Sequence, residues 1–258
     1  MRKNIKRPLI VFAAGLVLVL GSGVGATRAA MTYQTDKQSV DFSTSTLTVD
    51  LQEYQGENYV SVSGEDTLTF PNLTAEDFHI GQKYDELVQV VNTGSYDEYV
   101  RVLLRKSWIT TDDVSETDAN GNEITTTSIT KNTTLDPKMI ELGIADGWIE
   151  DYTEETEEGK IYYYTSPLSS GAAAQFLTSV TINNKVYEYV TTEESDIKGT
   201  IVNEYAYNGE SFYVEVRVDA VQAHNAEESL LGAWGVEADV TDDGVITSVN
   251  GVTLGQSN

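Results

Sequence analysis

The sequence predicts an all-β protein, a jelly-roll-like antiparallel β-sandwich with two short helices and surface insertions. Several segments alternate apolar and polar residues with a period of two, as half-buried strands do. Val, Thr, Tyr and Ile are frequent in these segments, and Asn-Gly and Asp-Gly pairs stand between them. Hydrophobic residues make up 40% of the 258 residues and aromatic residues 9%, so we expect a packed core rather than a disordered acidic chain.

The first residues have the layout of a secretory signal peptide. A basic start is followed by an uncharged, largely apolar run over residues 9–26 and then by small residues. Small residues at the −3 and −1 positions fit Thr27 and Ala29, which predicts cleavage between Ala29 and Ala30. The alternative is a retained membrane anchor, because the run reaches the lower limit of a membrane span.

Removal of residues 1–29 makes the chain more acidic. The full chain has 16 basic and 41 acidic residues, and the leader holds five of the basic ones, so the remainder has 11 − 41 = −30. This charge argues against nucleic acid as a partner, because phosphates require Lys and Arg. We expect a secreted protein that is either free outside the cell or held there by protein–protein contacts, with its charge on outward faces and loops.

The absence of cysteine excludes several kinds of functional and structural site. Without Cys there is no disulfide framework, no thiolate catalysis and no Cys-ligated zinc. Packing and strand pairing alone must then hold the fold.

The strands are assigned in order from the alternation. The clearest is 212–220, where Phe212, Val214, Val216, Val218 and Ala220 point inward. An Asn-Thr-Gly turn at 92–94 predicts a hairpin between strands 86–91 and 99–106. The remaining expected strands are 46–52, 60–62, 67–70, 161–164, 176–182, 185–191 and 201–207.

Two short helices and one insertion complete the expected domain, residues 44–258. Asp136 before Pro137 predicts a helix over 137–142. Asn225 with Glu228 resembles a capping box that opens a helix through Leu231, ended by Gly232. The polar insertion 110–134 is either a long surface loop or an outlying hairpin that turns at 120–121.

Catalytic motifs are not found in the sequence. His79 and His224 are the only histidines, and His224 is followed by Asn-Ala-Glu-Glu, so the HExxH zinc motif fails. We therefore expect no enzyme and assign no catalytic, cofactor-binding or metal-binding residue. Two acidic segments, 150–158 and 239–250, leave Ca²⁺ as an alternative to a solvated loop and to a hairpin turn, respectively.

Three longer stretches carry a family resemblance. They are 92–102, 135–142 and 212–226, with shorter matches at 147–149, 162–164 and 233–236. Together they resemble the TasA/camelysin family of exported Gram-positive matrix proteins. The leader at 25–30 resembles substrates of the dedicated SipW-type signal peptidase. The insertion 110–134 and the stretch 168–174 depart from the family pattern.

The resemblance implies a secreted structural protein that assembles with itself into extracellular biofilm-matrix fibres. In such fibres the mature N-terminal segment of one subunit, here 30–43, adds as a strand to the next subunit. The donor residues would be Met31, Tyr33 and Thr35 on one side, then Val40 and Phe42. An ordinary first strand or a disordered leader is the competing interpretation of this segment.

Two other functions stay open at this point. The first is a monomeric surface-binding or adhesive module, which binds other matrix or cell-surface components through acidic hairpin tips and outward tyrosines (Tyr99, Tyr162, Tyr164 and Tyr213). The second is a camelysin-like metallopeptidase, a label that some relatives carry and for which this sequence supplies no ligand set.

Overall fold

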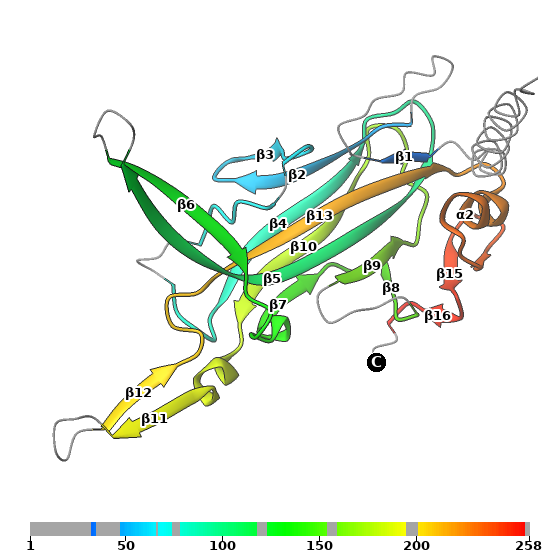
Figure 1. The fold of residues 1–258 in the computed structure, drawn as a ribbon. Helices are drawn as coiled ribbons and strands as arrows, with labels where there is room; N and C mark the ends of the chain where they lie inside the picture. Colours follow the sequence, from blue (N-terminus) through cyan, green and yellow to red (C-terminus); the bar gives the residue numbers. More distant parts are fainter. Residues whose placement is uncertain are drawn as a thin grey trace, which may run out of the picture.

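The computed structural model describes residues 32–34, 47–65, 67–73, 78–117, 123–153, 159–194 and 201–255. Every paired strand in these ranges is antiparallel, and the two larger sheets pack face to face (Figure 1). The predicted all-β sandwich is therefore confirmed. The expected leader and its cleavage site lie outside the described residues.

Each large sheet has a five-strand path. The first sheet runs in the order β1 (Thr32–Gln34), β13 (Ser211–Gln222), β5 (Glu98–Thr117), β9 (Gly159–Tyr164) and β8 (Trp148–Asp151). The second sheet runs in the order β3 (Asn58–Ser61), β2 (Val49–Gln55), β4 (Lys83–Asn92), β10 (Ala173–Ile182) and β7 (Ile140–Ile144). Strands that are distant in sequence therefore lie side by side in both sheets.

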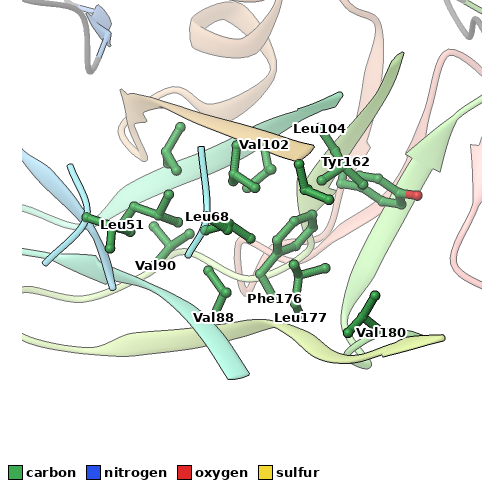
Figure 2. Close-up of a cluster of buried hydrophobic side chains, with 14 of the residues drawn as sticks. Leu51, Leu68, Val88, Val90, Val102, Leu104, Tyr162, Phe176, Leu177 and Val180 are labelled. Atoms are coloured by element: carbon green, nitrogen blue, oxygen red, sulfur yellow. The ribbon is translucent and has the colours of Figure 1, made fainter. Parts of the chain in front are cut away.

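The main core lies between these two sheets. Val88 and Val90 of β4 face Val102 and Leu104 of β5, with Phe176 of β10 among them (Figure 2). The predicted inward positions of β13 from Val214 to Ala220 are all buried. Period-two alternation thus identified the core-facing side of these strands correctly.

A further layer covers the outer face of the first sheet. It consists of α2 (Ala226–Trp234), β14 (Ala238–Val240), β15 (Ile246–Val249) and β16 (Val252–Thr253). This layer buries Tyr99, while Tyr162 faces the main core, so the prediction that these two tyrosines point to solvent is wrong. The sequence pattern shows the two faces of a strand but does not show that both are covered.

Two hairpin arms project from the sandwich (Figure 1). β6 (Glu123–Lys131) pairs with the outer part of β5, so the insertion forms the outlying hairpin of the two alternatives. The second arm consists of β11 (Val190–Glu194) and β12 (Ile201–Tyr205). Ahead of it, a 3-10 turn, η2 (Asn184–Glu188), replaces the first part of the predicted strand 185–191.

The hairpin predicted at 92–94 does not form. β4 pairs with β2 and β10 in one sheet, whereas β5 pairs with β13, β6 and β9 in the other. The side-chain amide of Asn92 donates to the carbonyls of Tyr96 and Leu168, each at 2.7 Å. These bonds stabilise a connection that crosses between the sheets.

Both predicted helices differ in extent. The first is only a 3-10 turn, η1 (Pro137–Met139), because β7 begins at Ile140 and pairs with β10. For α2, Asn225 has φ 52° and makes no side-chain cap bond, so the capping box is absent. Gly232 does not end this helix, which continues to Trp234 and ends at Gly235 with φ 72°.

We predict that Phe176→Ala lowers the free energy of unfolding by about 3–5 kcal/mol, because the ring fills the centre of the core. Phe176 has no exposed surface and its ring centroid lies 4.9 Å from that of Trp148. Ile129→Ala on the β5–β6 arm, where Ile129 is 63% exposed, changes stability by less than about 0.5 kcal/mol. Urea unfolding measures both, and equal losses would contradict this core.

Candidate strand-pairing edge

β13 has two edges: one pairs with β5, and two separate segments lie along the other. On one side, β5 pairs with β13 over its whole length, from Ser211 to Gln222. On the other side, β1 pairs with the end of β13, with Tyr33 opposite Ala220. Further back along this second edge, the Leu68 N–H donates to the Val214 carbonyl at 2.9 Å. The edge away from β5 is thus shared by β1 and by a short segment around Leu68.

β1 contacts this edge through three residue pairs, Thr32–Val221, Tyr33–Ala220 and Gln34–Asp219. The next described residue is Leu47, so β1 is separated in sequence from the sandwich body. Among the predicted donor residues, Tyr33 lies in β1 opposite a core-facing position of β13. Met31, Thr35, Val40 and Phe42 lie outside the described residues, as do Ala29 and Ala30.

The outer face at this end of β13 is closed by the helical layer. Asp219 is buried and accepts from Arg101 Nε at 2.8 Å. The Arg101 guanidinium in turn lies 5.1 Å from the ring centroid of Trp234 in α2. With one face in the core and the other under α2, β13 offers a partner its main-chain edge.

Three glutamate side chains are buried in the sandwich, contrary to the expectation that the charge is outward. Glu53, Glu86 and Glu98 are each at most 1% exposed. Glu53 follows Val49 and Leu51 on the inward side of β2. The signal that sequence reasoning missed is a glutamate at an inward position of an alternating strand.

Glu53 and Glu86 act as a pair. Burial raises the pKa of Glu86 to about 8, and the neighbouring Glu53 carboxylate adds to this shift. Burial acts in the same direction on Glu53, but hydrogen bonds from Thr69, Phe70, Gln55 and Glu86 outweigh it and lower the pKa of Glu53. At neutral pH the pair therefore holds one proton, on Glu86, which donates to the ionised Glu53.

Glu98 is the first residue of β5, in the first sheet. Its Oε1 accepts from the backbone N–H of Thr48 at 3.2 Å, and its Oε2 has no hydrogen-bond partner among the residues that the structure describes. Burial raises the pKa of Glu98 to about 7, and the bond from Thr48 opposes this shift. Glu98 thus joins the first described residues before β2 to the first sheet.

The two histidines are placed far apart. His79 is exposed and comes just before the start of β4. His224 is exposed and comes just after β13, whose last residue, Gln222, pairs with Glu98, a residue that follows the other end of β4. Within the described ranges, no group of three or more His, Cys, Asp or Glu side chains is arranged to hold a metal ion. The structure therefore brings no catalytic pair or ligand set together from these histidines.

The two acidic segments considered for Ca²⁺ have different outcomes. In 239–250, β14 and β15 form a hairpin, and the Asp239 carboxylate accepts from the Ser248 hydroxyl at 2.5 Å. In 150–158, Glu150 pairs with Lys160, and Asp151 accepts from Thr153 and Asn250. Residues 154–158 lie outside the described ranges. In both segments, carboxylates are thus already engaged in hydrogen bonds or ion pairs with other side chains or backbone groups of the protein.

Comparison with family models, with curated proteins and with solved structures finds no match to this chain. Across the residues that the structure describes, no helix is long and apolar enough to cross a membrane.

We predict that Glu86→Gln changes how stability depends on pH. Because the pKa of Glu86 is raised to about 8 in the folded protein, Glu86 makes the free energy of unfolding fall as pH rises from about 4.5 to about 8. Glutamine keeps a donor to Glu53 but does not titrate. The variant therefore gains stability relative to the wild type as pH rises from 5 to 8, measured by urea unfolding at several pH values. Parallel curves for the two proteins would rule out this role.

Proposed function

We propose that this chain is a secreted structural protein whose subunits form extracellular fibres of the biofilm matrix, as the TasA/camelysin resemblance implies. The observation that carries the proposal is the β1–β13 pairing. A three-residue strand, separated in sequence from the sandwich body, adds to a main-chain edge of the first sheet. The mature N-terminal segment is then the donor strand that a neighbouring subunit receives.

The pairing can be exchanged between subunits without a change in chemistry. A strand from the same chain and one from a neighbour offer β13 the same backbone donors and acceptors. Exchange from one subunit to the next is head-to-tail, so it builds an open filament rather than a closed ring. Because main-chain bonds need no charge complementarity, they suit subunits with a net charge of 11 − 41 = −30 after leader removal.

The predicted signal-peptide cleavage site lies just ahead of β1 in the sequence. Cleavage between Ala29 and Ala30 by a SipW-type signal peptidase leaves two residues ahead of Thr32, where β1 begins. The donor strand would then start almost at the new N-terminus. The partners in this proposal are further copies of the chain, together with other matrix or cell-surface components.

We predict that deleting residues 30–42 from the mature protein abolishes filaments and leaves a folded sandwich, because β1 is lost while both sheets keep their other strands. Electron microscopy measures filaments, and circular dichroism measures folding. A variant with residues 30–42 scrambled is the control for chain length and composition. Filaments formed by the deletion variant would refute donor-strand exchange.

We predict that a Thr32→Cys/Val221→Cys variant forms disulfide-linked oligomers within filaments. These residues are directly opposite in the β1–β13 register, and the chain has no other cysteine. Exchange places the two cysteines of each bridge on different subunits, so a non-reducing gel shows a ladder. The Thr32→Cys/Arg217→Cys control is four positions out of register, about 13 Å along β13, and forms no ladder. Bridged monomers alone would mean that β1 stays within its own subunit.

A specific observation favours a second candidate, the surface-binding module. Tyr187, Tyr189 and Tyr205 at the β11–β12 arm are between 42% and 54% exposed. Tyr187 and Tyr205 pack edge to face with ring centroids 6.2 Å apart. Tyrosines, which combine an apolar ring with a polar hydroxyl, are enriched at binding interfaces. Such a module stays monomeric at high concentration, which sedimentation analysis distinguishes from filament formation.

A further inference from the structure

A short segment before β4 occupies part of the edge that a donor strand would need. We call residues 68–70 (Leu68, Thr69 and Phe70) the strap. Leu68 N–H bonds to Val214 of β13, and the buried Leu68 side chain lies in the core near Leu51 and Val90 (Figure 2). The strap therefore occupies the β13 edge as a single strand residue would.

The strap is held by a carboxylate from the opposite sheet. Glu53 Oε1 accepts from the backbone N–H groups of Thr69 at 2.9 Å and Phe70 at 3.0 Å. Glu53 Oε2 accepts from the Thr69 hydroxyl. Since Glu53 belongs to β2 and Val214 to β13, these bonds connect the two sheets through the strap.

Phe70 adds conformational strain to the strap. Its φ of 50° is in the left-handed region, which a residue with a Cβ adopts at a cost in energy. The bond to Glu53 and an edge-to-face contact with Phe212, at 5.3 Å between centroids, hold Phe70 there. Loss of the bond to Glu53 would therefore favour departure of the strap.

The register of β1 shows where a longer strand meets the strap. Gln34 is opposite Asp219, and Val214 lies 219 − 214 = 5 positions further back. A strand that continues in this register brings residue 34 + 5 = 39 opposite Val214, where Leu68 is bonded. A donor strand of residues 30–42 thus cannot pair along its full length while the strap is in place.

We propose that the strap is a gate on the β13 edge and that Glu53 with Glu86 is the latch that holds it closed, so that a full-length donor strand pairs only after the latch opens. This proposal rests on the proposed function and deepens it. It makes assembly depend on a resident segment of the receiving subunit, in addition to the incoming strand.

The latch has a defined charge state. Among the described residues, the groups that act on Glu53 are Gln55 of β2, Thr69 and Phe70 of the strap, and Glu86 of β4, and the group that acts on Glu86 is Glu53. No cation is among these groups within the described residues. When Glu86 loses its proton, with its pKa raised to about 8, two buried carboxylates adjoin without a counter-charge. Alkaline conditions should then open the latch.

The test measures capture of a fluorescent peptide of residues 30–42 by the mature protein. We expect Glu53→Gln to capture the peptide about tenfold faster at pH 7, the change that corresponds to loss of about 1.4 kcal/mol of latch energy. Wild-type capture should accelerate between pH 7 and pH 9, whereas Glu86→Gln should not. Glu57→Gln, an exposed site in the turn after β2, removes the same charge and should behave as the wild type.

Hydrogen exchange provides the second readout and needs no assembly. The amides of Leu68, Thr69 and Phe70 should exchange faster in Glu53→Gln than in the wild type, while those of β13 bonded to β5 stay protected. If Glu53→Gln does not fold, Thr69→Val removes one latch bond and should raise the same exchange by a smaller factor. Unchanged strap exchange in both variants would overturn the latch, whether or not filaments form.

The remaining outcomes separate the gate from the proposed function. Faster strap exchange without faster capture, in a protein whose wild type forms filaments, would overturn the gate and keep donor-strand exchange. Failure of every variant and the wild type to capture peptide or form filaments would refute the proposed function, and the gate with it.

Discussion

Main-chain pairing along β13 is the constraint on which the rest of the structure depends. β5 bonds to one edge over the full strand, and β1 and Leu68 divide the other. One face of β13 lies in the main core, and the end of its other face is closed through Arg101, Asp219 and Trp234. Because side chains on both faces are committed to packing there, a new partner is received most readily through backbone hydrogen bonds.

The buried carboxyls connect this edge to the second sheet. An ionised carboxylate in a core is costly unless several donors satisfy it. Glu53 meets that condition through the strap backbone, the Thr69 hydroxyl and the protonated Glu86. The same contacts that make burial of Glu53 tolerable thus also determine where residues 68–70 lie. Occupation of the β13 edge by the strap and protonation of Glu86 are consequently linked through Glu53.

The acidity of the chain and the pairing of β1 with the β13 edge support one interpretation of the protein. Strong mutual repulsion discourages casual surface association between subunits, whereas strand addition gains its energy from main-chain bonds that charge does not supply. A head-to-tail arrangement of this kind has no built-in end. The proposed fibre is therefore consistent with both the composition of the chain and the topology of its first sheet.

The sequence by itself determined the fold class and the inward positions of strands such as β13, because a period of two records which face is buried. It did not determine which strands pair. The segment 92–94 connects the two sheets instead of forming a hairpin, and part of the predicted helix 137–142 forms β7 instead. In both places, pairing with strands distant in sequence overrides local propensity. Only the tertiary structure placed Tyr99 under the outer layer of α2 and β14–β16, Glu53 against Thr69, and Leu68 on the edge that β1 shares. These contacts join residues far apart in the chain, and no local pattern encodes them.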